Sequence, residues 1–119
     1  IDGMWFMQMA GRPVFKWAVR LVDESVRRVI DHSGLSSEQI SQWFFHQANV
    51  RILDAAVEAL GIDRDRVVMH LDRYGNTSAA SIPIALDETF RAGDLRRGDN
   101  VVMSGFGAGL AWGTLAWRW

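Results

Sequence analysis

The stretch from residue 43 to residue 61 limits the fold most, because it joins a buried strand directly to an amphipathic helix. Trp43-Phe44-Phe45 is an aromatic run of the kind that ends a buried strand. Gly61 is placed to end the helix, whose apolar residues recur on one face at Ile52, Ala55, Ala56, Ala59 and Leu60. His46 therefore lies where a strand leads into a helix, and open α/β sheets bind their ligands outside such strand ends.

A second junction of the same kind follows. Val67-Val68-Met69 is a short run typical of a strand, and Asn76-Thr77-Ser78 begins a helix with an apolar face formed by Ile82, Leu86, Thr89 and Phe90. Ser78 is able to cap this helix, so Asn76 is not needed as its N-cap. If the two strands are parallel neighbours, His46 and Asn76 emerge at the same edge of the sheet. Two distant parts of the chain would then form one polar site.

The rest of the chain continues the alternation of strands and helices. Strands are predicted over residues 4–9, 101–103 and 110–119, a long amphipathic helix over 15–30, and a short helix whose capping box is Ser36 and Gln39. Such alternation predicts the α/β class, with a mostly parallel five-stranded sheet covered by helices. The last two strands are joined by a short glycine turn and are predicted to pair antiparallel. Residues 1–119 are expected to form a single domain.

Composition excludes several classes of function. The net charge of −1 gives no support for nucleic-acid binding, and no apolar run reaches the roughly 20 residues that span a bilayer. The chain has no cysteine, and therefore no disulfide framework, zinc–thiolate site or thiol nucleophile. His32, His46 and His70 lack metal-ligand spacing, so no metal site is expected. Ile1-Asp2-Gly3 shows neither a secretion signal nor an initiator methionine, which fits a fragment or a processed product.

A glycine motif lies near the C-terminal end, at Gly105, Gly107 and Gly109. It is not the dinucleotide-binding fingerprint, because Leu110 stands where the third glycine would be and a strand follows instead of a helix. One interpretation is a tight turn. The other is a loop whose bare backbone lets a ligand or an N–H donor come close, and we expect a mixture of the two.

Three segments together resemble the signatures of one family, the β-ketoacyl-acyl-carrier-protein synthases III of the thiolase superfamily. They are residues 46–52 (HQANVRI), 74–81 (YGNTSAAS) and 105–113 (GFGAGLAWG). Met9-Ala10-Gly11 and Val14-Phe15-Lys16 match as well, so the resemblance covers essentially the whole chain in order. The family has a fold of two halves, each a five-stranded layer between helices. The resemblance implies that this chain is the C-terminal half of a thiolase-like fold.

The resemblance also implies an activity. The family joins an acyl primer, taken from acyl-CoA, to a malonyl-carrier-protein thioester with loss of carbon dioxide, and it uses a Cys-His-Asn set. His46 and Asn76 match the histidine and the asparagine. Two fixed donors of this kind would stabilise the enolate oxygen that decarboxylation creates. The cysteine belongs to the other half in the family, so the isolated chain is expected to be inactive in condensation.

Further residues are assigned by the same resemblance: Gly11, Phe15, Ala48, Asn49 and Ile52 to the pantetheine channel, Phe106 and Ala108 to the malonyl pocket and oxyanion hole, and Lys16 and Arg51 to carrier-protein docking. Ala108 stands where the family usually has glycine, and its backbone N–H would act as the donor. Glu58 and Ala59 replace two lysines of the best-known members.

The resemblance implies no cofactor beyond acyl-CoA as a substrate. The whole enzyme is expected to be a cytoplasmic homodimer that includes its own N-terminal half and binds malonyl-carrier protein. Two alternatives remain open. One is another thiolase-superfamily acyltransferase of secondary metabolism with the same His and Asn, and the other is a non-catalytic thioester-binding half. The His46/Asn76 pair argues against the second alternative, because a pure scaffold needs no such pair.

Overall fold

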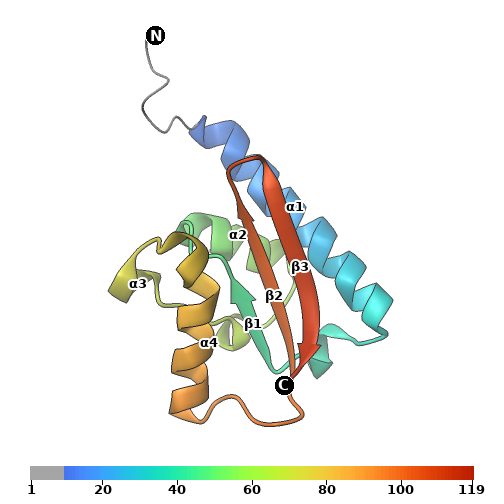
Figure 1. The fold of residues 1–119 in the computed structure, drawn as a ribbon. Coiled ribbons are helices and arrows are strands. Elements are labelled where there is room, and N and C mark those ends of the chain that lie inside the picture. The colour runs from blue at the N-terminus through green and yellow to red at the C-terminus, as the bar shows by residue number, and fades with distance from the viewer. Residues whose placement is uncertain (1–9) are drawn as a thin grey trace.

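The computed structural model describes residues 10–119, which form three layers with a sheet in the middle (Figure 1). The helices are α1 Gly11–Ser33, α2 Val50–Leu60, α3 Leu71–Tyr74 and α4 Ser81–Ala92, and the strands are β1 Gln42–Phe45, β2 Asn100–Gly107 and β3 Ala111–Arg118. Three 3₁₀ turns connect them, at Ser37–Gln39, Arg64–Arg66 and Ser78–Ala80. The α/β class predicted from the alternating pattern is confirmed.

The sheet has the order β1-β2-β3, in which β1 and β2 are parallel and β2 and β3 are antiparallel. The closing antiparallel pair is therefore confirmed. The strand predicted over residues 67–69 does lie beside β1 and parallel to it, but it is reduced to one bridge between Trp43 and Val67. The strand predicted over residues 4–9 lies outside the described residues. Of the five strands expected, the described part of the chain contains three and this single bridge.

The turn at the glycine motif is shorter than predicted, because two of its three glycines belong to strand β2. Strand β2 continues through Gly105, which pairs with Gly113, and ends at Gly107, which pairs with Ala111. Ladder hydrogen bonds come from the backbone alone, so glycine does not stop the pairing. The turn is limited to residues 108–110.

Both faces of the sheet are covered where β1 and β2 run. Trp43, Phe45 and Val102 pack with α1 and α2 on one face, and Phe44 and Val101 pack with α4 on the other (Figure 1). Successive side chains of a strand point to opposite faces. An unbroken apolar run such as residues 43–45 is therefore what a strand between two helical layers requires. This packing fixes the end of β1, from which His46 emerges.

Two glycines end the helices that cover the first face. Gly34 follows α1 with φ of 70°, and Gly61 follows α2 with φ of 64°. Both are left-handed conformations that favour glycine, so the ends predicted at these positions are confirmed. Helix α1 is also tied to the sheet by a short hydroxyl chain, in which Ser25 Oγ lies 2.9 Å from Thr114 Oγ1 and Thr114 Oγ1 lies 2.7 Å from Ser104 Oγ.

Strand β3 carries large apolar side chains that the described residues leave uncovered. Leu115 and Trp117 are 43% and 58% exposed, and Trp112 is 57% exposed. Leu115 and Trp117 alternate with Thr114 and Ala116, which face α1 and its core, so they lie on the α4 side of the sheet. Helix α4 covers β1 on that side but leaves β3 bare (Figure 1).

This bare surface predicts self-association of the isolated chain. We expect sedimentation velocity to show dimers or larger species, and the double substitution Leu115→Lys with Trp117→Lys to shift the chain toward the monomer. Val50→Lys is the matched control, because Val50 is exposed on α2, away from β3. A wild-type chain that sediments as a monomer would contradict this prediction.

None of the helices in residues 10–119 combines the length and the apolar character that crossing a bilayer requires. Over the same residues, no cluster of three His, Asp or Glu side chains is arranged to hold a metal ion.

Candidate active site

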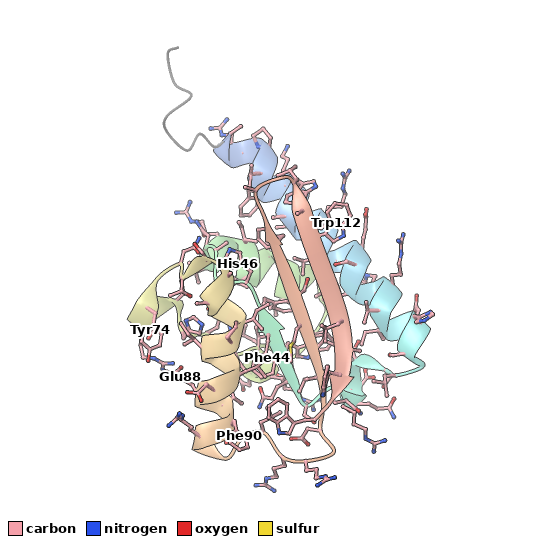
Figure 2. The ribbon with its side chains drawn as sticks, in the orientation of Figure 1. Phe44, His46, Tyr74, Glu88, Phe90 and Trp112 are labelled. Carbon is pink, nitrogen blue, oxygen red and sulfur yellow. The ribbon has the colours of Figure 1, made fainter. Side chains whose placement is uncertain are left out.

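His46 follows β1 directly, as predicted. Its backbone N–H donates to Ser104 O at 2.9 Å and so extends the β1–β2 ladder by one residue. Its carbonyl accepts from the Ala48 N–H at 3.0 Å, which turns the chain toward α2. The ring meets the Phe106 ring edge to face, with centroids 5.3 Å apart and planes at 84°. Figure 2 shows His46 beyond the carboxyl end of β1. The imidazole is thus held by backbone pairing on one side and by an aromatic ring on the other.

Partial burial lowers the pKa of the His46 imidazole below its ordinary value, because removal from water disfavours the charged ring. The ring is therefore neutral at pH 7. A neutral imidazole keeps one N–H donor and one free lone pair, whereas the charged ring would donate from both nitrogens. The neutral ring can donate one N–H to a developing negative charge. A charged imidazolium would instead bind the substrate carboxylate before decarboxylation.

The lowered pKa predicts how stability depends on pH. Below the ordinary histidine pKa of about 6.5, the unfolded chain takes up a proton that folded His46 resists, so the free energy of unfolding declines from there down to the folded pKa. We expect urea denaturation to show this decline, NMR titration to place the pKa of His46 below 6.5, and His46→Gln to make the decline smaller. A His46 pKa at or above 6.5 would contradict the prediction.

Asn76 lies in the loop between α3 and the Ser78–Ala80 turn. Its Oδ1 accepts a hydrogen bond of 2.9 Å from the Ser78 backbone N–H. An N–H can only donate, so this bond fixes which end of the amide is oxygen. Among the described residues none accepts a bond from Nδ2, which leaves two N–H donors for a ligand.

The expectation that Ser78 caps the helix is wrong. Helix α4 begins only at Ser81, without a side-chain cap, and Ser78 opens the preceding 3₁₀ turn with a positive φ of 52°. Asn76 instead accepts from the Ser78 N–H two residues later, which closes a turn ahead of the 3₁₀ segment. One side chain therefore closes the turn with its oxygen and offers its nitrogen outward, so its structural and functional interpretations are compatible.

Two sets of contacts hold the loop that carries Asn76. The Tyr74 hydroxyl donates to Glu88 Oε1 of α4 at 2.6 Å, and Arg73 pairs with the other oxygen of the same carboxylate (Figure 2). At the base of the loop, His70 Nε2 lies 2.8 Å from Ser81 O. Sequence reasoning considered His70 only as a possible metal ligand and gave Glu88 no role. No periodicity marks either residue, because each acts by bridging segments far apart in the sequence.

His46 and Asn76 belong to neighbouring segments. The bridge between Trp43 and Val67 sets the two runs side by side and parallel. His46 follows the first run directly, as the sequence predicted, whereas Asn76 follows the second run only after helix α3. The two side chains do not hydrogen-bond to each other in the described structure, so a ligand would have to accept from each separately.

Phe106 and Ala108 lie at the end of β2 and in the turn that follows. Phe106 contacts His46 on one side and Trp17 of α1 on the other, where the ring centroids are 6.0 Å apart. The structure thus brings Phe106 and His46 together. Ser78 is the only non-glycine residue of 10–119 with positive φ, so Ala108 has a backbone conformation open to any residue. Alanine in place of glycine is therefore compatible with the exposed turn.

The residues assigned to the pantetheine channel lie at the starts of two adjacent helices. Gly11 and Phe15 are in the first turns of α1, Ala48 and Asn49 precede α2, and Ile52 is buried in its first turn. Asn49 caps α2 by accepting from the Arg51 N–H at 2.8 Å. Helices α1 and α2 pack against each other, so the two groups lie on one side of the sheet.

Lys16 of α1 and Arg51 of α2 are exposed, as docking residues must be. Glu58 and Ala59 are exposed near the far end of α2, where Arg27 of α1 donates to Ala59 O at 2.7 Å. An arginine from α1 thus stands beside the position that lacks the two lysines.

A family model described as the C-terminal region of 3-oxoacyl-[acyl-carrier-protein] synthase III matches residues 30–119. The chain belongs to this family. The synthase III of Rhodopirellula baltica is 56% identical over 114 residues, which cover 96% of this chain and 33% of that protein. The synthase III of Desulfitobacterium hafniense is 53% identical over 98% of this chain and 35% of its own length. The chain therefore spans about a third of the length of these relatives.

Solved structures of synthases III agree with this assignment. The enzyme from Thermus thermophilus superposes with a TM-score of 0.91 at 49% identity and covers 94% of this chain and 35% of its own. The enzyme from Aquifex aeolicus superposes with a TM-score of 0.95 at 44% identity, over 99% of this chain and 38% of its own. OleA from Xanthomonas campestris has the same fold at lower identity, with a TM-score of 0.87 at 26% identity, over 93% of this chain and 33% of its own. The thiolase-like fold of a C-terminal half is confirmed.

Proposed function

We propose that this chain supplies the histidine and asparagine of a condensing enzyme that joins an acyl primer to a malonyl thioester. The observation that carries the proposal is the pair of donors that follow two neighbouring parallel segments, β1 and residues 67–69. His46 is neutral, and Asn76 is oriented by Ser78 so that its amide nitrogen is available. Membership in the synthase III family and the fit to solved synthases III support the same reaction.

The reaction begins with decarboxylation of the malonyl thioester. The bond between the carboxylate carbon and the α-carbon breaks, carbon dioxide leaves, and the electron pair forms an enolate with its charge on the thioester oxygen. N–H donors from His46 and Asn76 stabilise that oxygen. The His46 imidazole is itself partly removed from water. The ring of Phe106, in edge contact with His46, fixes the imidazole and keeps water from one side of it.

The enolate carbon then attacks the acyl thioester that a cysteine holds, and the cysteine leaves as a thiolate. The given sequence has no cysteine, so this nucleophile belongs to a part of the enzyme outside these 119 residues. The Ala108 backbone N–H would donate to the oxyanion of this second step. Gly11, Phe15, Ala48, Asn49 and Ile52 would line the pantetheine path between α1 and α2, and Lys16 and Arg51 would meet the acidic carrier protein. The substrates are acyl-CoA and malonyl-carrier protein, and the working unit is a cytoplasmic homodimer without a further cofactor.

The test uses the full-length gene product that contains these residues. It is incubated with acyl-CoA and analysed by intact mass and thiol labelling, and release of carbon dioxide from malonyl-carrier protein is followed separately. We expect one acylated cysteine, and we expect Asn76→Ala to keep acylation while it loses most of the decarboxylation. Thr89→Val, a buried hydroxyl of α4 bonded to Ala85 O, is the matched control that leaves both steps intact. A gene product that neither takes up an acyl group nor releases carbon dioxide would overturn the proposal.

A second candidate is a condensing acyltransferase whose thioesters are carried by other groups than the carrier protein of fatty-acid synthesis. The observation that favours it is the pair Glu58 and Ala59, exposed where two lysines are expected. The similarity to OleA shows that this fold is not limited to synthases III. Comparing malonyl-carrier protein with malonyl-CoA separates the two, because only the first candidate requires faster turnover of the protein-bound thioester.

A further inference from the structure

The side chain of Gln47, next to His46, is completely buried and makes three hydrogen bonds. Its Nε2 donates to Phe45 O at 3.0 Å and to Val68 O at 3.2 Å, and its Oε1 accepts from the His70 backbone N–H at 3.2 Å. Both amide hydrogens and one oxygen lone pair are thus used inside the protein. Burying a carboxamide without such partners is costly, so this arrangement has to be specific.

The three bonds have the pattern of a missing strand residue. In a parallel ladder, a residue donates to the carbonyl before its partner and accepts from the N–H after it. Gln47 Nε2 bonds to Val68 O and Oε1 bonds to His70 N–H, so the carboxamide takes the place of a backbone residue paired with Met69. Regular backbone pairing is found two residues earlier in the 67–69 run. There Trp43 pairs with Val67, and the Val68 N–H donates to Trp43 O at 3.0 Å.

The carboxamide also replaces a backbone hydrogen bond that β1 would otherwise make to residues 68–70. If the ladder continued from Trp43 and Val67, Phe45 would pair with Met69 and Phe45 O would accept from the His70 N–H. Instead, Gln47 lies between them: it donates to Phe45 O and accepts from His70. This insertion is the physical reason why the strand predicted over residues 67–69 is only a single bridge. It also separates the carboxyl ends of the two runs, at the point where His46 and the loop of Asn76 begin.

From His70 the connection reaches the other side of the Asn76 loop. The His70 ring is buried, and its Nε2 lies 2.8 Å from Ser81 O, which as a carbonyl can only accept. Nε2 therefore carries a proton and donates it to this carbonyl, and Nδ1 has no partner in the described structure. Thr77 Oγ1 lies 2.9 Å from Ser81 Oγ. Residues 70 and 81 thus close the base of the loop that carries Asn76.

We propose that Gln47 is a positioning residue: its carboxamide, inserted between β1 and the 68–70 segment, sets the distance between His46 and Asn76. This inference rests on the proposed function, because it assigns a role relative to those two donors. Gln47 is adjacent to His46 in the chain, and through His70 and Ser81 it is bonded to both ends of the Asn76 loop. Shortening or removing the carboxamide shifts one donor against the other, while each donor keeps its own local contacts.

The test compares two half-reactions of the full-length gene product carrying Gln47→Met. Loss of positioning should lower kcat of malonyl-thioester decarboxylation by about 10- to 100-fold, the scale expected for a misplacement near 1 Å. KM and the rate of cysteine acylation should stay within about twofold of wild type, because neither depends on the spacing of the two donors. In an Asn76→Ala background, Gln47→Met should cause little further loss, since one donor is already absent.

Two further variants complete the design. Gln47→Asn keeps the amide but shortens the side chain, and it replaces Gln47→Met if the latter does not fold. Thr89→Val, which removes a buried hydrogen bond remote from both donors, should leave kcat unchanged. Equal losses in acylation and decarboxylation, or full decarboxylation in a folded Gln47 variant, would overturn the positioning role. If His46→Ala and Asn76→Ala both decarboxylate at the wild-type rate, the proposed function fails instead.

Discussion

Replacing His46 by alanine is expected to lower the rate of malonyl-thioester decarboxylation by about 10²–10³-fold, the usual effect of removing one donor from an oxyanion site. The imidazole is neutral because burial lowers its pKa, and it is fixed by the ladder bond to Ser104 and by the Phe106 ring. A methyl group restores neither the N–H nor the aromatic contact. The measurement is carbon dioxide release at saturating substrate in the full-length gene product, where kcat should fall and KM should change little.

His32→Ala is the control for this experiment. His32 is an exposed residue of α1, so it tests the loss of a histidine without touching the site. Combining His46→Ala with Asn76→Ala should cost less than the product of the two single effects, because two donors to one oxygen act as a unit. A His46→Ala enzyme within a few-fold of wild type would remove His46 from the mechanism.

Replacing Phe44 by alanine is expected to lower the free energy of unfolding by about 3–5 kcal/mol, the typical cost of a large-to-small change in a core. Phe44 is completely buried in the middle of β1 and packs with Ala85 of α4, Leu95 and Val101 of β2. Because natural domains are stable by only about 5–15 kcal/mol, this single change takes a large share of the total. The measurement is chemical denaturation followed by circular dichroism.

Phe90→Ala is the matched control, since it removes the same side chain from α4 at a position that is 55% exposed. Its expected effect is much smaller, because most of the ring is already in water and its main aromatic contact is with Trp119 at 5.9 Å. Similar losses for Phe44→Ala and Phe90→Ala would mean that β1 is not the core strand described above. Where Phe44→Ala is too unstable to purify, Phe44→Leu gives the same comparison with a smaller step.

Sequence patterns were sufficient for the layers and for the first junction. The aromatic run 43–45 has to be buried on both faces, and glycines 34 and 61 have to end helices, because few residues accept their backbone conformation. The position of His46 follows from the same reasoning, since it stands just beyond an apolar run. These features depend on local chemistry, which a single sequence displays. Asn76 is separated from residues 67–69 by α3, which the sequence did not predict, and α4 begins at Ser81 instead of at residues 76–78.

The parts that sequence reasoning missed depend on contacts between distant segments. Gln47 looks like an ordinary polar residue of a turn, and nothing near it indicates that its side chain is inserted beside residue 69. The sequence gives no sign that the His70 ring bonds to Ser81 O, because the two residues meet only in the folded structure. Ser78 is a residue type that often caps helices, yet it adopts a positive φ, its N–H donates to Asn76 Oδ1, and α4 begins three residues later without a side-chain cap. Which side chain bonds to a nearby backbone N–H is decided by geometry and not by residue type alone.

The strand order has a consequence for synthesis of the chain. Strand β1 pairs with β2, and the roughly 60 residues between Trp43 and its partner Val102 include α2, α3 and α4. At about 5–20 residues per second, ribosomes need about 3–12 s to add this interval. For that time Trp43, Phe44 and Phe45 are translated but have no neighbouring strand on the β2 side. The aromatic run that organises the folded sheet is thus also a segment that the nascent chain exposes before its partner strand exists.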